Sequence, residues 1–263
     1  MKKLLLLTIF SFILLSSFSI SLATEVDSLI IFGKQKLALA VNTWQEADLL
    51  GARAFFERLS NDENYPWLIH YYIALADYRL VSFCFSTNDK DKAKQFIEDG
   101  ITHLKTSLEQ QPDYAEAHSL LGALYGNKIA INPFLGITLG PKSGLEMERA
   151  IRLEPRNPRS YLISGCSAYF RPKLFGGGKE KARAQFERAL ALFDSCRVDN
   201  PIMPDWGQAE ANAWLGMCQM DNKEYVAADS SFERALNINP DYGWVKYVLR
   251  PELAKKMTQD PAN

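Results

Sequence analysis

The residues with the clearest chemical suggestion are a glycine run followed by a lysine, Gly176-Gly177-Gly178-Lys179. The backbone amides of such a run can surround a phosphate group, which the lysine would neutralise. A nucleotide-binding loop of this kind needs a glycine five positions before the last one, and a serine or threonine after the lysine. Lys173 and Glu180 occupy those two positions. We therefore expect a tight turn that opens a helix, where glycine avoids steric strain, and no nucleotide site.

The three histidines, His70, His103 and His118, form no pattern typical of a catalytic or metal site. None lies within helical reach of another along the chain, and the sequence contains neither an HExxH nor a GxSxG signature. The acidic residues Glu146 and Glu148 are two positions apart, which places them on different faces of a helix. The sequence therefore predicts a protein that is not an enzyme and binds no metal or other cofactor.

Four cysteines lie among apolar neighbours in helical patterns: Cys84, Cys166, Cys196 and Cys218. No CxxC pair is present, so neither a zinc site nor a thioredoxin-like motif is indicated. In an oxidising compartment, four thiols allow three complete disulfide pairings. Because buried thiols behave as small hydrophobic groups, we expect free cysteines, and the sequence alone leaves disulfide formation open.

The first 23 residues have the pattern of a secretory signal peptide. Two lysines precede a strongly apolar run over 4–15, and a small-x-small exit ends at Ala23. The apolar run is shorter than the roughly 20 residues that a membrane-spanning helix needs. We expect cleavage after Ala23, export to the periplasm or the extracellular space, and no stable membrane insertion afterwards.

The charge balance argues against a nucleic-acid partner. The 263 residues include 30 basic and 31 acidic side chains, a formal net charge of −1. Removal of the first 23 residues, with their two lysines, would leave a net charge of −3. A basic excess, the usual sign of binding to nucleic acid or to anionic lipid, is absent from this composition. Hydrophobic residues make up 47% of the chain, which suits the core of one domain.

The remaining chain reads as one amphipathic helix after another. Prolines at 112, 155 and 240 each end one helix and precede the next. The predicted helices cover 25–41, 43–60, 65–86, 89–110, 113–131, 142–153, 157–169, 178–195, 205–220, 223–238 and 241–257.

The most specific spacing in these helices lies near the C-terminus, in Leu215, Gly216, Ala228, Phe232, Ala235 and Pro240. It resembles the tetratricopeptide repeat (TPR), whose signature runs W-x2-L-G-x2-Y, then A-x3-F, then P. Such a repeat is a pair of antiparallel helices that must stack on a neighbour, so one repeat predicts several. Segments 158–194 and 115–155 follow the pattern with about five and nine extra residues, which we place in loops at 171–178 and 132–140. Within 43–60, Trp44, Ala47, Gly51 and Ala54 resemble a second repeat helix, and 65–110 keeps the pattern loosely.

The resemblance implies an all-α protein, an α-solenoid of about five TPR-like antiparallel helix pairs. The expected organisation is a signal peptide (1–23), divergent N-terminal helical hairpins (24–110), TPR-like repeats (111–242), and a C-terminal capping helix and tail (243–263).

In TPR proteins, the first helix of each repeat lines a concave groove, and fixed repeat positions point into it. Carried onto this sequence, the resemblance implies a partner-binding groove that includes Leu162, Cys166, Tyr169, Ala213, Met217, Met220, Tyr71 and Tyr78. This set lacks the lysines and asparagines with which chaperone-linked TPR proteins hold a peptide carboxylate. Its apolar character, with Met and Tyr, favours another protein or peptide as the partner, for example an amphipathic helix. Alternatively, the loops at 132–140 and 171–178 cover these residues.

Two functions are consistent with this pattern. The first is a non-catalytic TPR scaffold that mediates protein–protein interaction in the cell envelope through the apolar groove. The second is a periplasmic transporter-accessory subunit that holds a small apolar ligand. The Pro-x-x-Phe-Gly-Gly stretch at 172–177 resembles a linker in the TPR-like subunit associated with some TRAP transporters. The second function predicts an enclosed apolar cavity.

Overall fold

The computed structural model describes residues 25–259 of the chain. The expected signal peptide (1–23) and the end of the expected tail (260–263) lie outside these residues. The described part is all-helical. Its α-helices are α1 (Glu25–Thr43), α2 (Glu46–Leu59), α3 (Pro66–Ser86), α4 (Lys90–Gln110), α5 (Ala115–Ile131), α6 (Gly136–Leu153), α7 (Pro158–Phe170), α8 (Lys179–Phe193), α9 (Gln208–Asp221), α10 (Tyr225–Ile238) and α11 (Arg250–Gln259).

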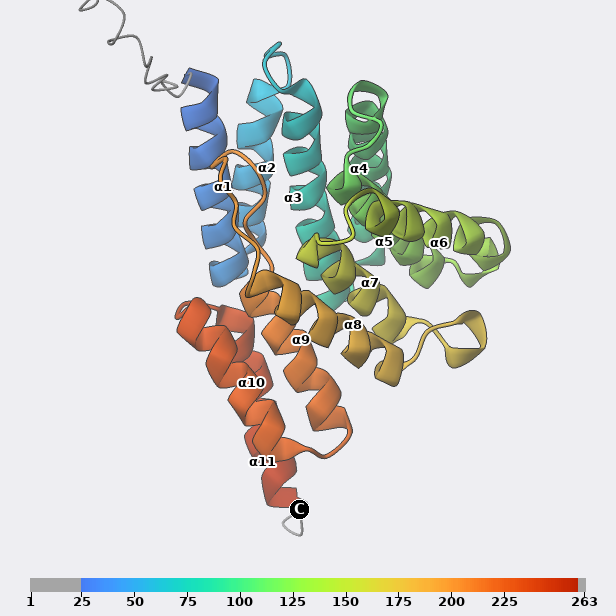
Figure 1. Ribbon diagram of the computed structural model, residues 1–263, viewed down its shortest axis with the longest axis vertical. Coiled ribbons are helices and arrows are strands. Elements are labelled where there is room, and N and C mark those ends of the chain that lie inside the picture. The colour runs from blue at the N-terminus through green and yellow to red at the C-terminus, as the bar shows by residue number, and fades with distance from the viewer. Residues whose placement is uncertain (1–24, 260–263) are drawn as a thin grey trace, which may run out of the picture.

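Consecutive helices pack as five antiparallel pairs, α1 with α2 through α9 with α10, and each pair stacks on the next (Figure 1). The expected α-solenoid of about five helix pairs is confirmed. A π-helical turn, Val245–Leu249, and α11 follow the last pair. This break divides the single helix expected over 241–257, because Pro251 lacks the N–H that a regular helix would use there.

A close contact between glycine and phenylalanine recurs within the pairs. A glycine on the first helix faces a fully buried phenylalanine ring on the second helix in three of them: Gly33 with Phe56, Gly165 with Phe186, and Gly216 with Phe232. A Cβ atom on any of these glycines would overlap the ring, so glycine allows the two helices to approach closely. The spacing that resembles the repeat includes Gly216 and Phe232 but not Gly33 and Phe56. Gly51, which the resemblance places on a second repeat helix, faces no atom within 4 Å.

The α5–α6 hairpin differs from its prediction. The expected loop at 132–140 is a 3-10 turn, Pro133–Leu135, followed directly by the first turn of α6, which begins at Gly136. Pro141 lies inside α6. The nine residues in excess of the repeat predicted a loop, but packing along the long helix α5 extends α6 toward the turn.

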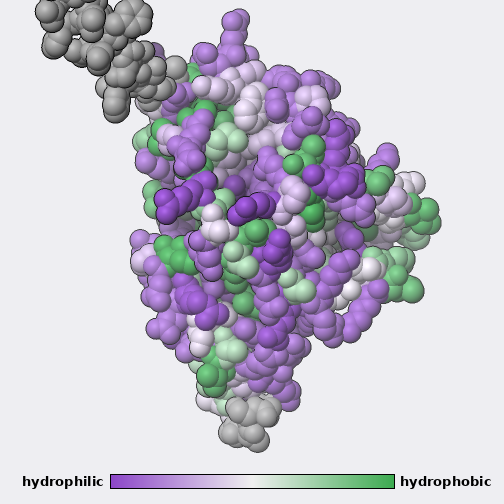
Figure 2. All heavy atoms as spheres, in the orientation of Figure 1, coloured by the Kyte–Doolittle hydropathy of each residue, from purple (hydrophilic) through white to green (hydrophobic). Residues whose placement is uncertain are grey.

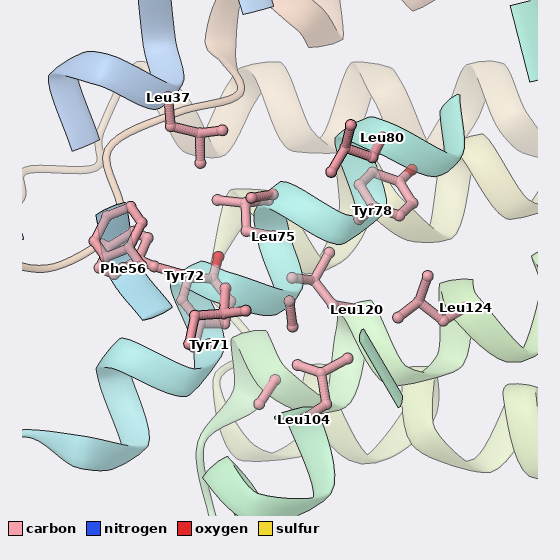
Figure 3. Packing of buried hydrophobic residues seen from close by; sticks show 14 of the residues in the cluster. Leu37, Phe56, Tyr71, Tyr72, Leu75, Tyr78, Leu80, Leu104, Leu120 and Leu124 are labelled. Atoms are coloured by element: carbon pink, nitrogen blue, oxygen red, sulfur yellow. The ribbon is translucent and has the colours of Figure 1, made fainter. Parts of the chain in front are cut away.

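The largest core lies among α1 to α5 (Figure 3). Phe56 of α2 stacks on Tyr72 of α3, with their ring centroids 4.9 Å apart. On the other side of α3, Leu120 of α5 closes the core. Nearly every residue of α3 from Leu68 to Val81 is buried, including residues that point away from its partner helix. Another part of the chain must therefore cover the side of α3 that points away from its partner helix.

Candidate partner-binding surface

The segment that covers α1 and α3 is the α8–α9 loop, residues 194–207. It runs from the end of α8 across the first helix pairs and returns to α9 (Figure 1). Ile202 is only 2% exposed, and Met203 and Trp206 pack against the same core as α1 to α5. The loop contains no helix of its own, so its position depends on contacts with helices that are distant in sequence.

Side chains of α1 and α3 hold the backbone of this loop. The hydroxyl group of Tyr72 donates a hydrogen bond to the carbonyl oxygen of Ile202 at 2.6 Å. The ammonium group of Lys34 donates to the carbonyl oxygens of Pro201 and Met203, each at 2.6 Å. Three successive carbonyl groups are thus hydrogen-bonded to side chains of α1 and α3. Residues 200–203 themselves form a turn, in which the N–H group of Met203 donates to the carbonyl oxygen of Asn200 at 3.0 Å.

Trp206 anchors the end of the loop. Its indole N–H donates to the hydroxyl oxygen of Tyr71 at 3.1 Å, and that hydroxyl group donates to the Glu116 carboxylate at 2.8 Å. Glu116 also forms a buried ion pair with Arg159. Burial, followed by the Glu116 charge, raises the pKa of Tyr71 well above its ordinary value, so the hydroxyl group remains protonated as a donor.

A second buried ion pair joins α3 to α9 beside the loop. The guanidinium group of Arg79 donates two hydrogen bonds, of 2.8 and 2.7 Å, to the two carboxylate oxygens of Glu210. The same guanidinium group lies 4.8 Å from the ring centroid of Trp206. This planar, doubly hydrogen-bonded arrangement is the strong form of an arginine–carboxylate contact. It fixes the first residues of α9 to the N-terminal half of the protein.

The eight residues predicted to form the groove lie on α3, α7 and α9, the first helices of their pairs. Six of them are buried in this structure: Tyr71, Tyr78, Leu162, Cys166, Ala213 and Met220. Tyr169 and Met217 are half-buried. The segment that covers the face is the α8–α9 loop, and neither 132–140 nor 171–178 takes that place. The apolar stretch Ile202-Met203 followed by Trp206, in a linker with no helical period, was the available signal for this role.

The two half-buried residues belong to the C-terminal half of the face. Tyr169 donates a hydrogen bond of 2.5 Å to Asp221, and Lys179 pairs with the same carboxylate at 2.7 Å. Burial and the hydrogen bond to Asp221 raise the pKa of Tyr169. Met217 packs beside the C-terminal core. This half of the face offers a partner a tyrosine ring, a thioether and a charged pair.

The two ends of the solenoid contact each other. The side-chain amide of Asn239, just after α10, donates to that of Asn42 on α1 at 2.7 Å, and Asn42 donates back at 3.3 Å. Val41 packs against the C-terminal core, next to Asn42. The face formed by the first helix of each pair is called the inner face below. It is bounded by the end of α1 as well as by the α8–α9 loop.

The glycine run opens a helix, as expected. Gly176 and Gly178 have φ values of 75° and 114°, which favour glycine. Lys181, in the first turn of α8, donates to the carbonyl oxygen of Gly176 at 2.8 Å. The Lys181 side chain therefore binds the backbone of the turn that precedes its helix, and the glycine run forms the start of α8.

The structure also brings together two histidines that are 33 residues apart. The Nδ1 atoms of His70 on α3 and His103 on α4 are 2.9 Å apart. Burial lowers the pKa of both rings, that of His103 to about 4, so one neutral ring donates to the other. Within residues 25–259, no group of three or more metal-ligating side chains is assembled. All four cysteines are free thiols.

Comparison with known proteins agrees with this geometry. Residues 209–242 match the tetratricopeptide repeat family model. No curated protein is significantly similar in sequence. Among solved structures, the HusA haemophore from Porphyromonas gingivalis superposes with a TM-score of 0.62 and 23% identity, over 75% of this chain and 94% of the haemophore. A thermophilic TPR protein from Thermus thermophilus superposes with a TM-score of 0.55 and 18% identity, over 86% of this chain and 99% of that protein.

The fold and its stacked helix pairs thus define an α-solenoid. Because its last pair matches the family model and most of the chain follows the fold of a TPR structure, the chain has a tetratricopeptide-repeat fold.

Proposed function

We propose that the protein is an exported, non-catalytic scaffold of the cell envelope that binds another protein on the inner face of its first helices. The partner occupies the place that the α8–α9 loop fills in this structure. The observation that carries the proposal is the way in which the loop is held: three successive carbonyl groups of a non-helical segment accept hydrogen bonds from Lys34 and Tyr72. TPR proteins generally bind other proteins, which supports this class of function. The signal-peptide pattern of residues 1–23 supports export.

The contacts of the loop define the chemistry of a suitable partner. Lys34 and Tyr72 bind backbone carbonyl groups, and such contacts supply affinity that does not depend on the side chains of the bound segment. Specificity comes from the sites that bind the side chains of Ile202 and Trp206, two residues that are four positions apart. Asp205 adds an ion pair with Lys34 at 3.0 Å. We expect the partner segment to carry an aliphatic residue, an acidic residue and an aromatic residue in this order.

A synthetic peptide copying residues 199–207 tests this proposal. In the variant Ile202→Ser/Trp206→Ser the loop loses both anchors, so the inner face becomes available to a fluorescently labelled peptide. The variant should bind the peptide at least about tenfold more tightly than the wild type, whose face is occupied. Fluorescence anisotropy measures the affinity, and a scrambled peptide should not bind.

The matched control is Val226→Ser/Tyr247→Ser, which removes two exposed apolar side chains outside the loop. It should bind the peptide as weakly as the wild type does. Circular dichroism first establishes that each variant is folded. If the Ile202→Ser/Trp206→Ser variant keeps its helicity and does not bind the peptide, the assignment of the inner face is wrong.

A carrier of a small apolar ligand is the second candidate, and it requires an enclosed apolar cavity. One cavity of about 480 Å³ lies between the α9–α10 turn and α11 and is lined in part by Asp221, Lys223 and Lys256. Another, of about 220 Å³, lies beside the α8–α9 loop and is lined in part by Glu116 and Arg159. These charged linings favour the scaffold. Native mass spectrometry separates the two functions, because a carrier would retain the extra mass of its ligand.

A further inference from the structure

One edge of the solenoid carries the turns that join the first helix of each pair to the second. Because the first helices of α5–α6 and α7–α8 are neighbours in the stack, their turns project from the same edge, at the right of Figure 1. These two turns, residues 132–137 and 170–178, are called the two apolar tips below.

The tips expose large apolar side chains to an unusual degree. Phe134 is 91% exposed and Ile137 is 88% exposed on the first tip, and Leu174 is 87% and Phe175 is 70% exposed on the second. Figure 2 shows hydrophobic surface at both places on the right-hand edge. Contiguous exposed apolar groups usually mark a surface that is covered by something else.

Two of the other equivalent turns are polar, and the turn between α1 and α2, Trp44-Gln45, carries a half-buried tryptophan that contacts the ring of Phe83. The equivalent turn between α3 and α4 is Thr87-Asn88-Asp89, and the turn between α9 and α10 is Asn222-Lys223-Glu224. Both of these turns are short and polar. Joining two helices therefore does not require the longer, apolar sequences of the tips.

The tips have a defined backbone. In the first tip, the N–H group of Phe134 donates to the Asn132 side chain at 3.2 Å. In the second tip, the N–H group of Phe175 donates to the carbonyl oxygen of Pro172 at 2.9 Å, and that of Gly178 donates to the carbonyl oxygen of Ala168 at 2.8 Å. These bonds hold the apolar side chains on the outside.

The surroundings of the tips are basic, although the whole chain has a net charge of −1. Residues 128–142 contain two lysines and no acidic residue, a net charge of +2, and residues 170–181 contain four basic residues and one acidic residue, a net charge of +3. Within the described part of the chain, no carboxylate lies at ion-pair distance from Lys142, Arg171 or Lys181. Lys128, Lys173 and Lys179 are paired with Glu98, Glu180 and Asp221, so the unpaired positive charges beside the tips are those of Lys142, Arg171 and Lys181.

We propose that the two apolar tips insert into the headgroup region of an anionic lipid bilayer, with the surrounding basic residues at the level of the phosphate groups. Apolar side chains inserted at the interface, combined with electrostatic attraction, give peripheral binding. No helix in residues 25–259 has the length and hydropathy to cross a bilayer, so the attachment is at the surface. A symmetric contact with a second copy would bring the same positive charges together, which disfavours that occupant.

Vesicle flotation tests this proposal. The apolar run at 4–15 would itself enter lipid, so the test uses the chain from Thr24 onward. Its packed helices all lie within Glu25–Gln259, and its helicity is measured first. The vesicles contain phosphatidylcholine alone or phosphatidylcholine with phosphatidylglycerol.

The tip variant is Phe134→Ser/Phe175→Ser, and the matched control is Val226→Ser/Tyr247→Ser, whose side chains are 73% and 74% exposed on other helices. The wild type and the control should float with the anionic vesicles. The tip variant should partition at least about tenfold less, because each buried apolar side chain contributes to binding. Added salt should weaken the binding of the wild type.

Three results would overturn the proposal. The first is a wild type that does not float with anionic vesicles, and the second is a tip variant that floats as well as the wild type. The third is light scattering in which the wild type forms an oligomer without lipid and the tip variant is a monomer, since the tips would then join two copies. Because these variants leave the inner face unchanged, peptide binding there is tested separately.

Discussion

Replacement of Gly165 by alanine should destabilise the protein, although alanine is the better helix-forming residue. The new Cβ atom would lie 2.5 Å from Cε1 and 2.7 Å from Cδ1 of Phe186. That ring is fully buried and has no free space to enter. Overpacking of this kind costs about 1–3 kcal/mol, and this close overlap places the cost near the upper end. The gain in helix propensity is about 1 kcal/mol. The net loss in the free energy of unfolding should be about 2 kcal/mol.

The matched control is the same substitution at Gly51 on α2, where a new Cβ atom meets nothing within 4 Å. Gly51→Ala should therefore stabilise the protein by up to about 1 kcal/mol. Urea denaturation followed by circular dichroism measures both changes, and equal denaturant slopes check that the transitions are comparable. In thermal unfolding, Gly165→Ala should lower the midpoint by about 4–8 °C for a chain of this size.

A double variant tests whether overlap with the Phe186 ring causes the loss of stability. If overlap with the ring is responsible, Gly165→Ala/Phe186→Leu should be less destabilised than the sum of the two single variants, since the leucine leaves room for the new methyl group. Additive effects, or a Gly165→Ala variant as stable as the wild type, would refute the packing argument.

Three further changes test the other contacts. Glu210→Gln should cost about 3–5 kcal/mol in chemical denaturation, because it leaves Arg79 as a buried, unpaired charge. Tyr72→Phe should remove the hydrogen bond to the Ile202 carbonyl group, so trypsin should cleave the α8–α9 loop faster while helicity is unchanged. Burial raises the pKa of Asp77 to about 7, so its contribution to the free energy of unfolding is full below about pH 4 and is lost as the pH rises through 7. Asp77→Asn should remove this loss, of up to about 4 kcal/mol, from denaturation curves measured across that range.

The helix pairs were predictable wherever the sequence keeps the spacing of the repeat. In the last pair, Gly216 and Phe232 are 16 residues apart, as in a standard repeat. In the first pair, the same contact joins Gly33 and Phe56, which are 23 residues apart. The extra residues lengthen each helix of the hairpin by about one turn. The packing is unchanged, but the spacing that identifies it in a sequence is lost.

The inner face was predictable only in part. The resemblance to the repeat places Tyr71 and Tyr78 on the inner side of α3, but it contains no information on what covers that side. The contact between Tyr72 and Ile202 joins residues 130 positions apart and depends on the curvature of the whole stack. The pairing of His70 with His103 likewise depends on how α3 and α4 align, which neither helix specifies alone.

The paired amides of Asn42 and Asn239 have a consequence for how this protein can change over evolution. An open repeat array gains or loses units by duplication and deletion, because each unit contacts only its neighbours. Here the first and last units also touch, through Asn42 and Asn239. Adding one helix pair would move the two ends apart, and removing one would make them collide. A change in the number of units would therefore break the contact between Asn42 and Asn239.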